Sequence, residues 1–292
     1  ATLERISKPV RGVNSWIAIP NSIDATAAAD ASEWAYVGKD ERTPDMLNCQ
    51  YDEAGAAWNL LGAAIPGDTI NDFSGSSVSL SGDGGTVVVG AWGNDGSTGT
   101  GTNSGHAAIY RFNPAIGTWN QLGTDLDGES IGDQSGFSVS LSEDGDVVAI
   151  GANFSDENGV DSGHVRVYDY DVNTNTWTPR GLDIGGEAAA DESGVSVSLS
   201  ANGNTLAIGA HLNNGNGNDS GHARVVEWNV ATGTWDQLGA DLDGVAIDDH
   251  AGWSVSLSDD GNTVAVGADR HDANGVDSGH ARVYRFDGLS WN

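Results

Sequence analysis

The sequence holds very little that could cross-link the chain or carry it into a membrane. Its 292 residues include a single cysteine, Cys49, and a single methionine. One cysteine excludes an intrachain disulfide and any metal site built on several thiolates. No apolar run approaches the roughly 18 residues that a membrane-spanning helix needs. The sequence therefore predicts no disulfide, no thiolate metal site and no membrane insertion.

Positive charge is also scarce. The chain has 12 lysines and arginines against 42 aspartates and glutamates, which gives a formal net charge of −30. Both lysines, Lys8 and Lys39, lie within positions 1–57, so the rest of the chain is the more acidic part. A field of this sign repels nucleic acid and anionic membranes and favours cations. We expect no nucleic-acid partner.

The third shortage is of helical patterns. No window of the sequence shows apolar residues at helical spacing, and charged residues make up only 18% of the chain. Glycine, by contrast, occurs 42 times. This composition favours many tight turns between short strands over helices with charged faces.

What the sequence does contain is a long internal repeat. Each unit carries the same four short segments, such as "WNQLG", "GFSVSLS", "VVAIGA" and "GHVRVYDY" in the second clear copy. The segment "SVSLS" alternates as a half-buried strand does, "VVAIGA" is continuously apolar, and "EDG" between them is typical of a hairpin turn. Four antiparallel strands per unit predict the blade of a β-propeller. The tryptophans that open successive units are Trp58, Trp119, Trp177, Trp235 and Trp291.

The fold class that we predict is thus an all-β propeller of about five four-stranded blades in one domain. Residues 1–57 form a degenerate first blade and a candidate assembly segment. The four clear blades are 58–118, 119–176, 177–234 and 235–292.

Three features of the repeat resemble the FG-GAP repeat proteins, whose type case is the propeller of the integrin α-chain. They are "DSGHVRVY", the "SVSLSxDG" hairpin and the "WxQLGxDLDG" opening. The resemblance covers residues 58–292 strongly and 15–57 weakly. It implies an extracellular or cell-surface propeller used in adhesion or assembly, often with calcium in its loops.

A Ser-Gly-His motif recurs once in each clear unit, and its histidines are evenly spaced along the chain. A catalytic triad is asymmetric, so four evenly spaced copies favour a structural role in which each histidine opens the final strand of its unit. The tryptophan of each unit is expected to pack between blades. The structural positions are His106, His164, His222, His280, Trp119, Trp177 and Trp235.

The loops before Ser-Gly-His carry an Asp-x-Asn-Gly-x-Asp pattern or a reduced form of it. Carboxylate and amide oxygens at this spacing are suitable ligands for calcium, although Asp and Asn also cap turns with no ion bound. Two Asn-x-Ser sequons, at Asn153 and Asn218, are candidate glycosylation sites. The candidate calcium ligands are Asp156, Asn158, Asp161, Asn216, Asp219, Asp272, Asn274 and Asp277.

These patterns favour a non-catalytic, extracellular structural or adhesive protein. Self-association through the less acidic head, residues 1–57, into head-to-tail oligomers or filaments is one hypothesis. A ligand- or carbohydrate-binding module of a cell-surface protein is the alternative. No stretch supplies a phosphate-binding glycine loop or a histidine-based metal site. A glycosidase-like enzyme would need acids that break the repeat on one axial face, and the sequence offers no clear set of these.

Overall fold

The computed structural model describes residues 35–39, 46–52, 57–96 and 102–292, with side chains from residue 58 onward within those ranges. Every regular element in the described part is a β-strand. Neighbouring strands within the sheets run antiparallel. The prediction of an all-β chain is therefore confirmed.

The strands form five successive sheets, three of which have four strands in sequence order and a short fifth strand at one side. The first sheet comprises β1 (Ala35–Lys39), β2 (Met46–Asp52) and β3 (Ala57–Leu60). The next comprises β4 (Ser77–Leu80), β5 (Thr86–Ala91), β6 (His106–Asn113), β7 (Thr118–Gln121) and β8 (Leu126–Asp127). The third comprises β9 (Ser138–Leu141), β10 (Val147–Ala152), β11 (His164–Asp171), β12 (Thr176–Pro179) and β13 (Ile184–Gly185). The fourth comprises β14 (Ser196–Leu199), β15 (Thr205–Ala210), β16 (His222–Asn229), β17 (Thr234–Gln237) and β18 (Leu242–Asp243). The last comprises β19 (Ala251–Leu257), β20 (Thr263–Ala268) and β21 (His280–Arg285).

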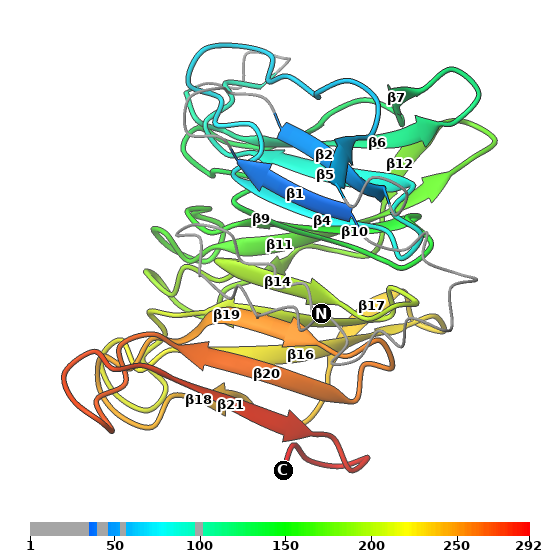
Figure 1. Cartoon of the computed structure of the whole chain (residues 1–292). Helices are drawn as coiled ribbons and strands as arrows, with labels where there is room; N and C mark the ends of the chain where they lie inside the picture. The colour runs from blue at the N-terminus through cyan, green and yellow to red at the C-terminus, as the bar shows by residue number, and fades with distance from the viewer. Residues whose placement is uncertain (1–34, 40–45, 53–56, 97–101) are drawn as a thin grey trace.

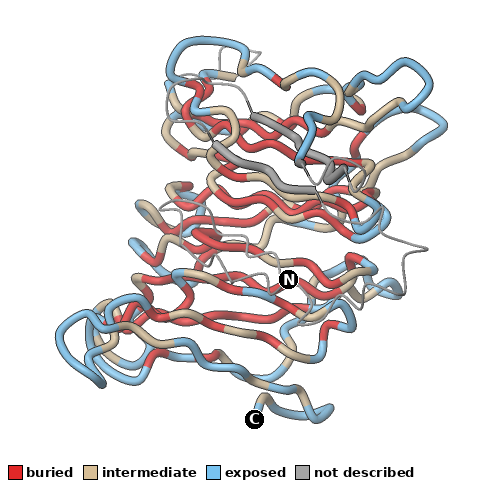
Figure 2. Tube along the Cα trace, in the orientation of Figure 1, coloured by how far each residue is buried: buried red, intermediate tan, exposed pale blue. Residues whose placement is uncertain are grey.

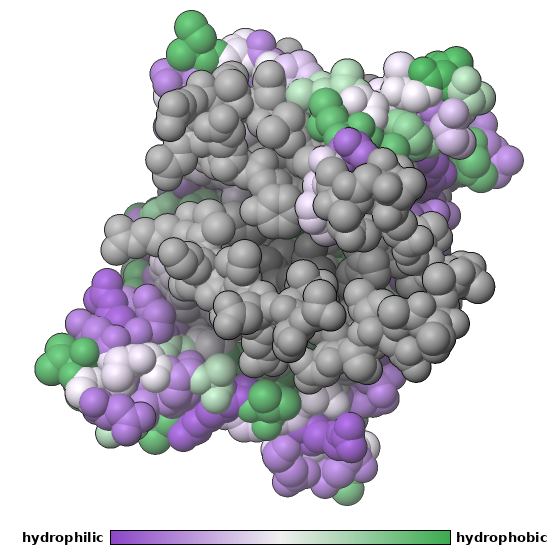
Figure 3. Space-filling model, viewed as in Figure 1, coloured by the Kyte–Doolittle hydropathy of each residue, from purple (hydrophilic) through white to green (hydrophobic). Residues whose placement is uncertain are grey.

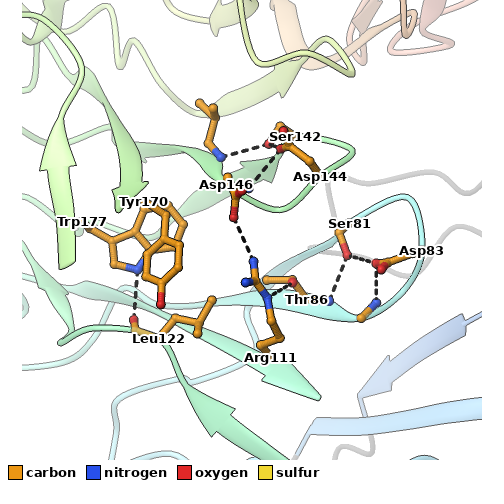
Figure 4. A network of polar contacts seen from close by, with 12 residues as sticks. Ser81, Asp83, Thr86, Arg111, Leu122, Ser142, Asp144, Asp146, Tyr170 and Trp177 are labelled. Carbon is orange, nitrogen blue, oxygen red and sulfur yellow. Dashed lines mark hydrogen bonds and ion pairs between the residues drawn. The ribbon is translucent and has the colours of Figure 1, made fainter. Parts of the chain in front are cut away.

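The predicted hairpin turns join the first and second strands of the repeated sheets. In the turn between β9 and β10, the Ser142 hydroxyl donates to Asp144 at 2.6 Å and accepts from the Val147 amide at 2.9 Å (Figure 4). Gly145 takes a positive φ of 75° there, a conformation that glycine adopts without strain. The Ser-x-Asp-Gly pattern thus fixes both the turn and the register of the two strands.

The core lies between successive sheets, where the second strands are buried on both faces (Figures 1 and 2). One apolar cluster includes Val88 and Ile109 from one sheet and Val139 and Ile150 from the next. This burial explains why "VVAIGA" is continuously apolar rather than alternating. Propeller blades pack face to face in this way, and the predicted propeller of four-stranded blades is confirmed.

The serines of the alternating first strands join one sheet to the next. Ser77 donates to the Gly136 carbonyl at 2.7 Å, and the Leu141 amide donates to the Ser79 hydroxyl at 3.0 Å. The next two sheets repeat both bonds. Small polar residues therefore recur in "SVSLS" because first strands of neighbouring sheets satisfy each other's polar groups there.

The strand that carries the tryptophan is the fourth strand of its sheet, and the first three strands of that sheet come before it in the sequence. Trp177 on β12 pairs within its own sheet, and its indole nitrogen donates to the Leu122 carbonyl in the previous unit at 3.0 Å (Figure 4). Trp119, Trp235 and Trp291 make the equivalent bond. A repeat unit counted from its tryptophan thus begins with the fourth strand of one sheet and goes on to the first three strands of the next sheet.

The three-stranded first sheet contains residues assigned to the degenerate blade, with Trp58 on β3. The rest of that blade, and the assembly segment at its start, lie outside the described residues.

Candidate functional site

The polar side chains that break the repeat meet at one end of the first and second strands. This is the end opposite the hairpin turns. Each second strand ends in Gly-Ala, and the residue that follows differs in every unit: Trp92, Asn153, His211 and Asp269. Each first strand is preceded by a residue that also differs: Phe73, Gln134, Glu192 and His250. This end of the sheets is where the units are least alike.

Five of these side chains form a continuous chain across three sheets. Asn153 donates to the Glu192 carboxylate at 3.2 Å, and that carboxylate lies 4.0 Å from Nε2 of His211. The His211 ring meets the His250 ring edge to face at 5.2 Å between centroids. Nδ1 of His250 lies 3.6 Å from the Asp269 carboxylate. We call Asn153, Glu192, His211, His250 and Asp269 the strand-end cluster.

The backbone before each first strand holds these side chains in a left-handed conformation. Glu192 has a φ of 52° and His250 a φ of 58°, and Phe73 and Gln134 share this geometry. Because all four units adopt it, the conformation belongs to the fold, and the side chain placed on it is what differs. Non-glycine residues at positive φ are uncommon and are often found at functional sites.

Burial shifts the proton affinities within the cluster in opposite directions. It raises the pKa of the Glu192 carboxyl, an effect that the hydrogen bond from Asn153 partly offsets. It lowers the pKa of His211 to about 3, with His250 and Arg270 adding to the effect. Burial and then Arg270 also lower the pKa of His250. The Glu192 carboxyl, whose pKa is raised, therefore lies beside an imidazole that stays neutral.

An aromatic surface borders the cluster. The Trp253 ring lies edge to face with His211 at 4.8 Å between centroids, and Trp253 is 39% exposed. Its equivalents in the two preceding units are Phe137 and Val195. An exposed indole beside polar groups can stack on the face of a sugar-like ring.

Sequence reasoning missed this cluster, although a signal for it existed. The histidines and the glutamate stand at aligned positions where the other units carry different residues. The two acids of the cluster, Glu192 and Asp269, were not singled out from the sequence. The sequence did not show that the end of the second strand in one sheet lies against the start of the next sheet.

The acids at the opposite end serve their own turns. Asp83 accepts from Ser81 at 2.6 Å and from the Gly85 amide at 2.7 Å, and the bond from Ser81 is the main reason that its pKa is lowered (Figure 4). The hairpins join one another through backbone bonds, such as the Glu143 amide to the Ala201 carbonyl at 2.9 Å. These acids stabilise the turns.

The histidines of Ser-Gly-His begin β6, β11, β16 and β21, and the first three are buried. Their serines close the preceding loop: Ser162 accepts from the Asn158 amide at 3.1 Å and donates to the Ser155 carbonyl at 3.2 Å. The glycine has no room for a side chain, since a Cβ at Gly163 would collide with the Ser193 carbonyl oxygen. The motif thus closes a loop of its own unit and also packs against the next unit.

Three of these histidines lie next to pairs of acids that could hold a metal ion. In each group one ligand atom from every residue lies within 4.8 Å of the others. Sequence reasoning found no histidine-based metal site, and these groups correct that point, since they join residues far apart in the chain. The groups are Asp68, His106 and Asp125; Glu157, His164 and Asp183; and Glu187, His222 and Asp241.

The loops expected to bind calcium are closed by their own hydrogen bonds. Asp156 accepts from the Asp161 amide at 2.8 Å, and Asp272 accepts from the Asp277 amide at the same distance. The last of these loops lies at the lower left of the space-filling view, where hydrophilic and hydrophobic residues are mixed (Figure 3). Calcium there stays a prediction.

The asparagines of these loops are engaged as well. Asn158 and Asn216 donate to the carbonyls of Gly186 and Gly244, and the Asn274 amide donates to Ser278. The Asp219 amide is held by Asn214 at 2.8 Å.

The two sequons differ in exposure. Asn153 is 1% exposed, and its amide is bonded to Glu192, so the folded chain does not present it as a glycan acceptor. Asn218 is exposed, and its amide donates to Asp219 at 2.8 Å.

Comparison with known proteins identifies the repeat and the fold. Residues 66–110 match the family model of the FG-GAP repeat, which confirms the resemblance seen in the sequence. No curated protein sequence matches the chain.

Among solved structures, the periplasmic gluconolactonase of Pseudomonas aeruginosa matches with a TM-score of 0.56 and 18% identity over 88% of this chain. A protein of Bacteroides fragilis named as a candidate 6-phosphogluconolactonase matches with a TM-score of 0.55 and 10% identity over 91%. This chain spans 66% and 67% of their lengths.

These matches and the strand-end cluster overturn the prediction of a non-catalytic structural or adhesive protein. The solved structures on this fold carry the names of lactone-hydrolysing enzymes, and a set of acids and histidines that breaks the repeat is present. The expectation that the chain is not an enzyme is wrong on the same grounds. In the part of the chain that the structure describes, no helix could cross a membrane.

Proposed function

We propose that this chain is a lactonase-type hydrolase that opens an uncharged sugar lactone at the strand-end cluster, through side chains that depart from the repeat. The observation that carries the proposal is the contact chain from Asn153 through Glu192, His211 and His250 to Asp269. The gluconolactonase with the same fold supports the choice of reaction.

In the proposed reaction Glu192 acts as the general base. Its carboxylate takes a proton from a water molecule as the water oxygen bonds to the lactone carbonyl carbon. The bond from that carbon to the ring oxygen then breaks, and the ring oxygen receives the proton back from Glu192. One water is consumed and a hydroxy acid forms, with no oxidant or reductant needed. Burial suits Glu192 to this role because a raised pKa makes it a stronger base.

Asn153 and His211 are positioning residues in this scheme. Asn153 holds one carboxylate oxygen of Glu192, and His211 is neutral at ordinary pH because its pKa is about 3. Trp253 offers an exposed ring face beside them for the sugar. His250 and Asp269 form the other end of the cluster.

Charge selects among lactones. A chain of net charge −30 repels a phosphorylated lactone, whereas an uncharged lactone feels no such field. Arg270 is the cation that acts electrostatically on the cluster, on His211 and His250. We therefore propose an uncharged aldonolactone, and a compartment outside the cytoplasm, as in the periplasmic neighbour.

The test is hydrolysis of glucono-δ-lactone above its spontaneous rate. Removing the general base by Glu192→Gln should lower kcat/KM by about 100-fold or more. Glu227→Gln, on the exposed outer part of β16, is the matched control and should keep full activity. His211→Gln should shift the pH profile of kcat more than it changes KM. Equal activity of the wild type and Glu192→Gln, or faster turnover of the 6-phosphate than of the neutral lactone, would count against the proposal.

A further inference from the structure

The buried ring of His164 makes no hydrogen bond. The residue is 2% exposed, and neither ring nitrogen has a hydrogen-bond partner among the described residues. Buried polar side chains nearly always have a partner, and leaving one without costs stability. Two nitrogens without partners at the first residue of β11 therefore call for a ligand that the protein chain does not itself supply.

Two carboxylates face this ring. Nδ1 of His164 lies 3.7 Å from Oε2 of Glu157, and an oxygen of Asp183 completes a group within 4.8 Å. The strand register places Asp183 there, because β13 pairs with β11 and sets Gly185 opposite His164. Glu157 comes from the loop that Ser162 closes. A loop and the starts of two strands of one sheet thus bring their ligand atoms close together.

The charges around the group favour a cation. Besides Glu157 and Asp183, the carboxylate of Glu129 lies near enough to add its negative charge to the group. Arg166 is itself occupied, since it binds Glu129 at 2.9 Å and the Asp127 carbonyl at 2.7 Å.

The neighbouring units hold similar groups in which the first acid comes from another element: Asp68 and Glu187 precede the first strand of their sheets, whereas Glu157 lies in the loop before β11. His106 meets Asp68 and Asp125, and His222 meets Glu187 and Asp241. The short strands β8 and β18 supply the second acid by the same register that β13 uses. His280 holds the same place in the last unit, but no such group is found around it among the described residues.

We infer that each of the three groups binds one divalent transition-metal ion of the zinc class, through one imidazole nitrogen and two carboxylate oxygens, with water in the remaining position. A mixed nitrogen and oxygen set of three ligands suits such an ion, whereas calcium prefers a larger shell made of oxygens. The sites are separate from the hydrogen-bonded turns of the Asp-x-Asn-Gly-x-Asp loops. None of their ligands belongs to the strand-end cluster, so the inference does not depend on the proposed reaction.

The experiment is metal titration of the full chain after chelator treatment and desalting. We expect one zinc ion per group by calorimetry and elemental analysis, and a rise in Tm with added zinc that calcium does not reproduce. Cobalt(II) in place of zinc should give visible absorption bands of low-coordinate nitrogen and oxygen ligation.

Matched variants localise the ions. His164→Asn should reduce the stoichiometry by one ion and the cobalt absorption by about a third. Asp183→Asn, which keeps the histidine, should do the same and guards against misfolding of the first variant. His280→Asn changes the same position of the motif in the last unit, where no such group of acids is found among the described residues. This variant should change neither the number of bound ions nor the cobalt absorption. Binding of no zinc, or equal losses in His164→Asn and His280→Asn, would overturn the inference.

Discussion

Burial, more than neighbouring charge, sets the ionisation of His164, His211 and His222. The pKa of His164 and His222 falls to about 4 and that of His211 to about 3, and desolvation is the largest cause in each case. In the unfolded chain these side chains would bind protons near a pH of about 6.5. The folded protein therefore holds them neutral over a range in which the unfolded chain is charged.

This difference predicts acid sensitivity. As the pH falls below about 6.5, the unfolded chain takes up protons that the fold excludes, so the free energy of unfolding decreases until about pH 4. Each histidine contributes on the order of 1–3 kcal/mol to this loss. Denaturant unfolding of the chelator-treated protein at pH 7 and pH 5 measures it. His222→Asn should flatten the dependence, and an identical slope in this variant would contradict the prediction.

At the scale of the strand, glycine decides how closely the sheets approach. Gly151, near the end of β10, faces the start of the next sheet, and a Cβ there would collide with the Gly194 carbonyl oxygen. Gly90 and Gly209 meet the same obstacle in their units. The glycine of the repeated Gly-Ala is therefore required by the contact between sheets and not by the conformation of the strand.

Gly151→Ala should force β10 and the next sheet apart and lower the free energy of unfolding by about 1–3 kcal/mol. Gly267 is the matched control, because the nearest atom to its Cβ would be the movable Ser254 hydroxyl, and no backbone atom of a further sheet lies against it among the described residues. Chemical denaturation of both variants measures the difference. A loss in Gly267→Ala as large as in Gly151→Ala would show that packing against the next sheet is not the cause.

At the scale of the whole molecule, self-repulsion opposes folding. A net charge of −30 is concentrated when the chain becomes compact, and few basic residues offset it. One arginine that offsets this charge joins two units: Arg111 on β6 forms an ion pair at 2.9 Å with Asp146 in the following sheet (Figure 4). Such exposed pairs contribute little against the total field.

Salt should therefore stabilise the protein. Raising sodium chloride from about 10 mM to about 500 mM shortens the screening length from about 30 Å to under about 10 Å. We expect the Tm to rise by several degrees and most of the gain to come below about 200 mM, where the screening length changes most. Thermal unfolding in metal-free buffer measures it. A Tm that is flat or falls over this range would mean that attractive pairs outweigh the net charge.

The sequence alone determined the architecture because the architecture is local and repeated. Three local patterns specify the strands and turns within a few residues: the alternation in "SVSLS", the apolar run "VVAIGA" and the Ser-x-Asp-Gly turn. The even spacing of their copies indicates that the same sheet is repeated. The spacing of the tryptophans was also clear, whereas the strand partner of each tryptophan needed the sheet order. The residues of the repeat were thus visible, but the contacts between repeats were not.

Only the tertiary structure decided where chemistry can occur. Asn153, Glu192, His211, His250 and Asp269 are far apart in the sequence, and nothing in a single unit relates them. They meet because the end of each second strand lies against the start of the first strand in its own sheet and in the next. The pairing of β13 with β11 likewise brings Asp183 to the metal-binding group of His164. Local patterns specify strands and turns, but a site depends on which strand ends become neighbours, and that is fixed only when the sheets pack.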